Sequence, residues 1–219
     1  MKLSIPKPIH GWREFAGEVG IIVLGVLIAL GAQQLVEWTN HLSQVDEMSA
    51  RLRRESLENR DGMNFDLASL RKSLNAVNNQ LSMLNGCRAP LDVTSFPPVK
   101  RPLVLLATDS AWLGVRDSAL LPMMPKDVVD NYWKLDATGQ QLIPILQDAQ
   151  VSFNDAEAAV SALRAGASDA QSCARAVHSL YRLRSAEQSL VNWVSFYQTA
   201  NEKVLLGERL APPKVRAEN

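Results

Sequence analysis

The stretch that decides the fold is Phe15–Val36, which reads FAGEVGIIVLGVLIALGAQQLV. From Val19 to Ala32 it contains no charged or strongly polar side chain, and in full it supplies the roughly 20 residues that a bilayer core requires. Trp12 and Trp38 lie on either side of this stretch. Tryptophan rings are typical of the headgroup regions that border a transmembrane helix. The stretch therefore predicts a single transmembrane helix over residues 15–36, anchored in the lipid bilayer.

Two other interpretations fit this stretch in part. It resembles the core helix of a soluble protein in composition, and it resembles a signal peptide because Ala29-Leu30-Gly31 is an acceptable cleavage site after a basic leader. The apolar segment is longer than a usual signal core, and helical sequence continues beyond it without a break. Both features favour an uncut anchor, although the residues alone leave cleavage open.

The basic residues near the anchor predict its orientation. Lys2, Lys7 and Arg13 precede it, whereas the first basic residue after it is Arg51. Because basic residues stay on the cytoplasmic side, residues 1–14 are predicted to form a cytoplasmic leader. Residues 37–219 then lie in the periplasm, and the protein is a single-pass protein of a bacterial inner membrane.

Two runs of sequence carry a resemblance. HGWREFAGEVGIIVLGVLIALGAQQLVEW at the anchor and TDSAWLGVRDSALLPMMP further along resemble recurrent patches of a family of uncharacterised proteobacterial single-pass membrane proteins. The resemblance is close over the anchor and loose elsewhere. It implies an inner-membrane location, and it implies no chemistry because the family has no assigned activity.

Helical periodicity continues after the anchor as far as Gly86. Apolar residues recur in steps of four and three, the heptad spacing of a coiled coil. The phase of this stripe shifts by one residue between Asn59 and Leu67, so a kink or stutter is predicted beside Gly62. Gly86 is predicted to end the helix as a left-handed cap. The apolar members of the later stripe are Met63, Leu67, Leu70, Leu74, Val77, Leu81 and Leu84.

The rest of the chain predicts further helices. Four prolines make residues 87–102 a loop, and a short helix begins at Thr108 or Asp109. A third helix starts at Pro125, is kinked at Pro144 and ends at Gly166, with a fresh start at Ser152 as an alternative. The last helix opens with a capping box, Ser168 to Gln171, and ends at Gly207. The predicted fold class is all-α: one N-terminal transmembrane helix, then an extended antiparallel helical bundle of four-helix type over residues 37–210, and a flexible tail over residues 211–219.

Composition and motifs indicate no reaction. The 23 basic and 23 acidic residues balance, so a nucleic-acid partner has no electrostatic support. The sequence contains no nucleotide loop, no nucleophile elbow and no histidine pair at metal-ligand spacing. His178 stands alone and is expected on a helix surface or hydrogen-bonded in the core. We therefore expect no enzyme, no cofactor and no metal.

Two sets of residues are candidate sites. Cys87 and Cys173 are the only cysteines, and in an up-down-up-down bundle both fall at the same end, which predicts a disulfide in an oxidising compartment. Two buried reduced thiols are the alternative. On the anchor, a shared helix face with a small-x-x-x-small pair predicts contact with another helix; its residues are Glu18, Gly25, Ala29 and Gln33.

The aromatic residues of the bundle allow two interpretations, a filled core or the lining of a ligand pocket; the core is favoured, and the residues are Trp112, Tyr132, Trp133, Trp193 and Tyr197. The predicted function is a membrane-anchored periplasmic interaction or scaffold protein that binds a protein partner or itself. The alternative is a sensory or regulatory module that signals through the anchor. The predicted leader of 14 residues is short for a segment that has to pass a signal to the cytoplasm.

Overall fold

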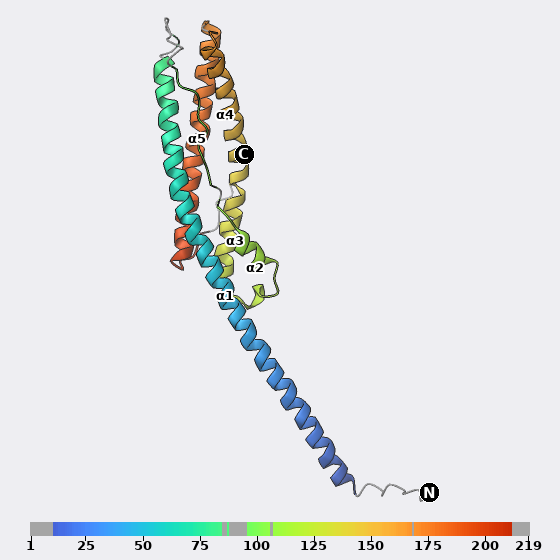
Figure 1. Ribbon diagram of the computed structural model, residues 1–219. Coiled ribbons are helices and arrows are strands. Elements are labelled where there is room, and N and C mark those ends of the chain that lie inside the picture. Colours follow the sequence, from blue (N-terminus) through green and yellow to red (C-terminus); the bar gives the residue numbers. More distant parts are fainter. Residues whose placement is uncertain (1–10, 85–86, 88–95, 106, 168, 212–219) are drawn as a thin grey trace, which may run out of the picture. The chain divides into compact units, whose positions relative to one another are not determined.

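The computed structural model describes residues 11–84, 87, 96–105, 107–167 and 169–211. These residues form helices and contain no strand, which confirms the all-α class. The elements are α1 Gly11–Leu84, α2 Ser110–Arg116, the 3-10 helix η2 Leu121–Met123, α3 Lys126–Gln140, α4 Leu142–Arg164 and α5 Ala170–Leu205 (Figure 1). The chain divides into two compact units, residues 1–48 and residues 49–219. The predicted leader and tail lie almost entirely outside the described residues.

The first unit is the N-terminal part of α1. The apolar stretch predicted over residues 15–36 is helical throughout, and none of its side chains is buried. Among the described residues, α1 is the one helix long and apolar enough to cross a membrane. Exposed apolar side chains over this length suit a lipid environment, which supports a single-pass membrane protein.

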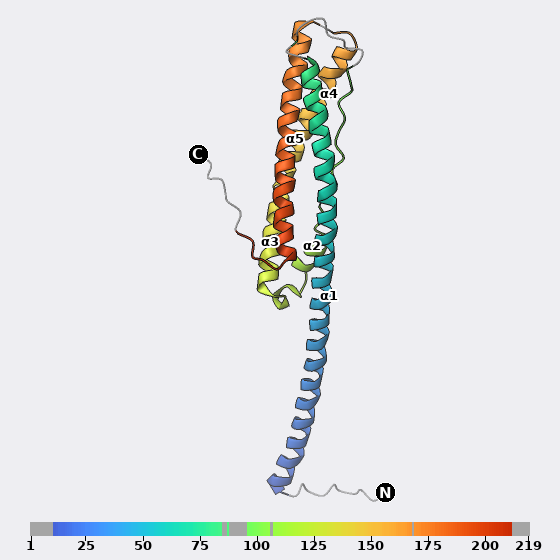
Figure 2. The same cartoon turned by 90° about the vertical axis from the view of Figure 1, so that its left-hand side faces the viewer.

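The second unit is built from three helical rods. Residues 49–84 of α1, then α3 with α4, and α5 lie side by side, as the two views in Figures 1 and 2 show. Cys87 meets Cys173 near the start of α5, whereas Ser56 accepts a hydrogen bond from Asn201 near its end. α1 and α5 are therefore antiparallel.

The fourth member of the bundle is not a helix. Residues 96–105 and 107–109 are extended, and they run back along α1 from Gln80 to Asn59. We call this segment the strap. The predicted descending leg of loop and short helix is present. Among its described residues from 96 onward, the strap is not helical and α2 is, so the unit departs from a four-helix bundle.

The core of this unit consists of two apolar clusters. One gathers α1, α3, α4 and α5 around Leu70, Leu135 and Trp193, and it includes Leu210 from the segment after α5. The other lies beside the disulfide and joins α1, α4 and α5 to Phe96 and Val99 of the strap. The strap thus closes one side of the core.

The predicted phase shift falls in a stretch of α1 where positions of both phases are buried. One four-three series of buried positions continues past Gly62 because polar side chains occupy the places where apolar ones are missing, and Leu67 and Leu74 of the shifted apolar stripe are buried beside that series. The helix is also uninterrupted through Gly62. The buried positions of residues 49–84 are Leu52, Ser56, Asn59, Met63, Asp66, Leu67, Leu70, Ser73, Leu74, Val77, Gln80 and Leu84.

Helix ends account for the other differences. α3 ends at Gln140 and α4 begins at Leu142, so Pro144 lies in a first turn, where a missing N–H costs no helical hydrogen bond. α4 continues through Ser152, which rules out the alternative start there. The N-cap of α5 is Asp169 rather than Ser168: its carboxylate accepts from the N–H groups of Gln171 and Ser172 at 3.0 and 2.9 Å.

The predicted glycine stops are confirmed where they are described. Gly166 and Gly207 follow α4 and α5 with positive φ angles of 102° and 73°, the left-handed region that glycine adopts without steric cost. Gly86 lies outside the described residues. After α1 the described residue with positive φ is Cys87, at 65°.

Candidate functional site

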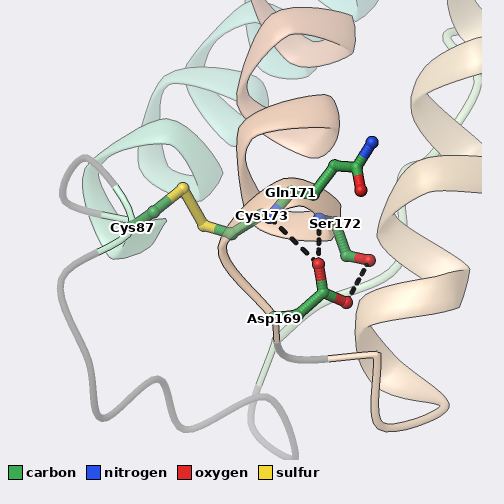
Figure 3. The surroundings of a disulfide bond; sticks show 5 residues. All are labelled: Cys87, Asp169, Gln171, Ser172 and Cys173. Atoms are coloured by element: carbon green, nitrogen blue, oxygen red, sulfur yellow. Dashed lines mark hydrogen bonds between the residues drawn. A yellow bond between two sulfur atoms is a disulfide. The ribbon is translucent and has the colours of Figure 1, made fainter.

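The two cysteines form a disulfide. The sulfur atoms of Cys87 and Cys173 lie 2.05 Å apart and the Cα atoms 5.7 Å apart, across 86 positions of sequence. Figure 3 shows the bond beside the Asp169 cap, so it joins the end of α1 to the first turn of α5. Hydrogen bonds from Ser172 lower the pKa of the Asp169 carboxyl. The predicted proximity of the two cysteines is confirmed.

A ladder of polar side chains on α1 holds the strap. Its members are Asn59, Asp66, Ser73 and Gln80, each seven residues from the next. Asn59, Asp66 and Gln80 bind backbone groups of the strap, and the Ser73 hydroxyl lies 3.5 Å from the C=O of Lys100. Asn59 binds both the N–H and the C=O of Thr108, at 2.8 and 2.7 Å. Buried backbone groups need partners, and an extended segment has none of its own. The ladder therefore fixes the register of the strap along α1.

Asp66 and Gln80 each make a single hydrogen bond to the backbone of the strap. Asp66 accepts from the N–H of Leu105 at 2.6 Å, and Gln80 donates to the C=O of Pro97 at 2.9 Å. Burial raises the pKa of the Asp66 carboxyl, and the bond from Leu105 opposes that rise. The sequence did carry a signal for this ladder, because its members share one heptad position.

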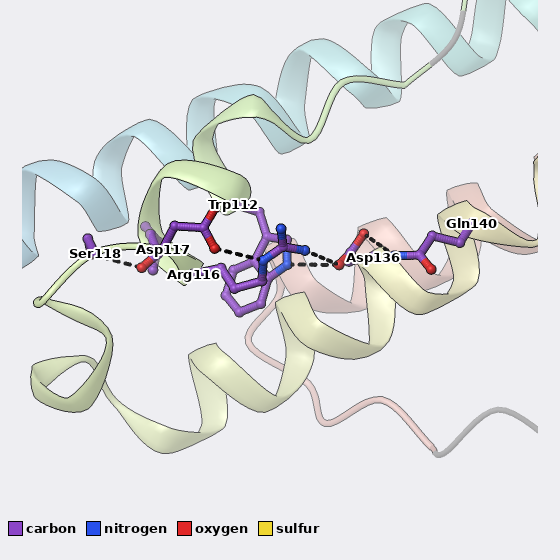
Figure 4. Close-up of polar contacts among 7 residues, drawn as sticks. Trp112, Arg116, Asp117, Ser118, Asp136 and Gln140 are labelled. Carbon is purple, nitrogen blue, oxygen red and sulfur yellow. Dashed lines mark hydrogen bonds and ion pairs between the residues drawn. The ribbon is translucent and has the colours of Figure 1, made fainter.

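A second polar group seats α2. The carboxylate of Glu55 on α1 accepts from the Ser110 hydroxyl at 2.6 Å and from the N–H of Ala111 at 2.9 Å. Asp136 on α3 accepts from the Trp112 indole N–H at 3.2 Å and lies 3.6 Å from the Arg116 guanidinium, as Figure 4 shows. These contacts give structural roles to residues of the run TDSAWLGVRDSALLPMMP, residues 108–125.

The aromatic residues mainly fill the core. Trp112 stacks on Tyr132 and meets Trp133 edge-on, and Trp193 stacks on Tyr197 with ring centres 5.0 Å apart. Of the five, only Trp133 is exposed. Trp112, Tyr132 and Tyr197 border a space of about 20 Å³, enough for a single water. Trp193 and Tyr197 also border a surface hollow of about 190 Å³ near Ile143, so the pocket interpretation stays open for these two residues.

Another cavity lies between the strap, α4 and α5. Its volume is about 260 Å³, and most of its lining is apolar. We call it the strap cavity; it is lined by Arg101, Pro102, Leu103, Val104, Leu146, Ala149, Gln150, Phe153, Leu183, Glu187 and Leu190.

Glu187 is the unusual residue of the strap cavity. Its side chain is buried, with 1% of the residue exposed. One carboxyl oxygen, Oε1, lies 2.6 Å from the Ser73 hydroxyl, whereas Oε2 has no hydrogen-bond partner among the described residues. Burial raises the pKa of Glu187 to about 7, although the bond from Ser73 acts in the opposite direction.

The sequence alone does not mark Glu187 as a site residue. Its one signal was an acidic residue in an otherwise apolar stripe of α5, between Leu183 and Leu190. A lone carboxylate on a helix is ordinarily solvated, so its burial becomes visible only once the strap and α4 are in place.

Other expected features are distributed as follows. His178 lies exposed on α5, one of the two positions predicted for it. Across the described part of the chain, no group of three or more His, Cys, Asp and Glu side chains is placed to hold a metal ion.

The predicted contact face of the anchor is open. Glu18, Gly25, Ala29 and Gln33 are all exposed, and a Cβ atom added at Gly25 would meet nothing within 4 Å. Gln33 donates to the Glu37 carboxylate at 3.0 Å, so its amide already has a partner within α1. The arrangement leaves room for a second helix at Gly25.

The fold and these sites define an all-α protein with one candidate membrane-spanning helix and a strap-bound helical unit. Searches against protein-family models, curated proteins and solved structures give no match to this chain. Its function is therefore inferred from its own residues.

Proposed function

We propose that the protein is a membrane-anchored interaction or scaffold protein. Residues 1–14 lie in the cytoplasm, residues 15–36 cross the bacterial inner membrane, and residues 37–219 face the periplasm. The observation that carries the proposal is the disulfide between Cys87 and Cys173, which follows an exposed apolar helix in the same chain. Stable disulfides belong to oxidising compartments, and the basic leader favours the same orientation.

The proposal assigns no reaction to the helical unit. Its buried polar side chains bind the chain's own backbone, as the ladder from Asn59 to Gln80 does, and this use is structural. Self-association has a candidate surface on the anchor, where Gly25 and Ala29 allow close approach and Glu18 supplies a polar group. The family resemblance of the anchor bears on the inner-membrane location and not on this role.

Topology is tested first. Alkaline phosphatase fused after Gly86 or after Leu210 should be active, and the mature protein should keep its original amino terminus. Inactive fusions would reverse the orientation, and a new terminus near Ala32 would mean a cleaved signal peptide. Either result would remove the proposed anchoring.

Partner binding is tested separately in intact cells. A photo-crosslinking amino acid placed at exposed Phe196 or Tyr181 on α5 should give discrete adducts, because a scaffold must contact its partners directly. The same probe at Trp133 on α3 samples another face. If all three positions give only the uncrosslinked chain, the interaction role fails.

A sensory or regulatory module is the second candidate, and the strap cavity favours it. A buried carboxyl with an unpaired oxygen is a costly feature for a purely structural unit. Signalling would also need a cytoplasmic partner for the short leader. Replacing Lys2 and Lys7 with Gln should then abolish a cellular response while leaving the helical unit folded, and an unchanged response would exclude signalling through the leader.

A further inference from the structure

We propose that the strap cavity binds a small, mostly apolar molecule carrying a protonated amine, with the Glu187 carboxylate as its counter-charge. The inference goes beyond the anchoring role and does not depend on it. The ligand class follows from the size of the cavity, its lining and the unpaired oxygen of Glu187.

The size of the cavity sets the size of the ligand. An apolar cavity of about 150 Å³ is enough to bind benzene. At about 260 Å³, the strap cavity has room for an aromatic ring with a short alkyl chain. Leu146, Phe153 and Leu190 provide apolar contacts for such a body. The ligand's polar group is then directed by the few polar side chains in the lining.

The Glu187 carboxylate lacks a hydrogen-bond donor for one of its oxygens. The Ser73 hydroxyl carries one proton and lies 2.6 Å from Oε1 of Glu187 but 3.5 Å from the C=O of Lys100. When the carboxylate is ionised, Ser73 donates to Oε1, and Oε2 is left without a donor. An ammonium group supplies both N–H donors and the opposite charge, which is the strongest way to satisfy a buried carboxylate.

The charged groups around Glu187 do not supply that partner. From α1 the facing side chain is Ser73, and from α4 the polar lining residue is Gln150, so neither helix contributes a charge to the lining. The strap contributes Arg101, whose guanidinium lies 4.7 Å from the ring centre of Phe153 and donates to Asn154 at 3.4 Å. Arg101 is therefore engaged with α4.

The test uses three probes of similar shape with the full-length protein in lipid nanodiscs: 2-phenylethylamine, 2-phenylethanol and 3-phenylpropanoate. Empty nanodiscs correct for partitioning into lipid. Isothermal titration should show the amine binding at least tenfold more tightly than the alcohol at pH 8, with no binding of the carboxylate. The ionised fraction of Glu187 falls from about 0.9 at pH 8 to about 0.03 at pH 5.5 for a pKa of about 7. Amine affinity should therefore fall by roughly 30-fold over that range.

Three variants separate charge from shape. Glu187→Gln should weaken amine binding at least tenfold at pH 8 and leave alcohol binding within threefold, whereas Ala149→Leu should block both ligands by filling the cavity. Glu157→Gln, at an exposed glutamate of α4, is the matched control and should change neither. Equal affinities for amine and alcohol, an unaffected Glu187→Gln variant, or no binding by the wild type would each overturn the proposal.

Discussion

Replacing Glu187 with glutamine should stabilise the protein at pH 8 and have little effect at pH 4. Burial raises the pKa of this carboxyl from its ordinary value of 4.5 to about 7, so the folded state holds the proton more tightly than the unfolded chain. The contribution of Glu187 to the free energy of unfolding is then most favourable below pH 4.5, falls as the pH rises towards 7, and stays low above pH 7. A change in pKa of this size corresponds to at most about 3 kcal/mol.

Glutamine removes the charge and keeps the shape. Its amide can donate to the Ser73 hydroxyl, which lies 2.6 Å from the glutamate in the native protein. The Glu187→Gln variant should therefore be about 2–3 kcal/mol more stable than the wild type at pH 8. For a chain of this length, that gain raises Tm by roughly 4–12 °C.

The assay is thermal and urea unfolding of the full-length protein at pH 4, 5, 6, 7 and 8, followed by circular dichroism with the disulfide intact. Glu157→Gln controls for the loss of an exposed carboxylate on α4. A Glu187→Gln variant no more stable than the wild type at pH 8 would refute the reasoning. An equal gain at pH 4 and pH 8 would refute it as well, since the effect would then be unrelated to ionisation.

Three further predictions concern the strap, the disulfide and the anchor. Asn59→Ala leaves both backbone groups of Thr108 without their partner and should lower the free energy of unfolding in urea by about 2–3 kcal/mol. The control Asn78→Ala, on the exposed face of α1, should lower it by less than about 0.5 kcal/mol. Cys173→Ser removes the bond that closes a long loop and should destabilise the protein by about 4 kcal/mol. In cells, non-reducing gels after alkylation should show no free thiol in the wild type. Two alkylated thiols in the wild type would contradict a periplasmic disulfide. Gly25→Ile adds a branched side chain where the anchor is open and should reduce self-association at least tenfold in a membrane two-hybrid assay, so unchanged association would exclude this face.

Residues close together in sequence carried most of the successful predictions. Helix formation and helix stops depend on neighbouring residues, so the apolar stretch at residues 15–36 and the stops at Gly166 and Gly207 were predictable. The proximity of Cys87 and Cys173 followed from the order of ascending and descending segments. The Ser168 capping box was wrong by one residue, because Asp169 is an equally good cap and only the backbone geometry chooses between them.

The sequence by itself determined that the chain is helical, that one helix carries a long exposed apolar stretch, and where α4 and α5 end, because each of these properties is set within a few turns of chain. The tertiary structure alone decided the roles of the buried polar residues. Asn59 meets Thr108 across 49 positions, and Ser73 meets Glu187 across 114. No local pattern encodes such a pairing, because the desolvation that makes each group need a partner arises only when the strap, α4 and α5 pack against α1.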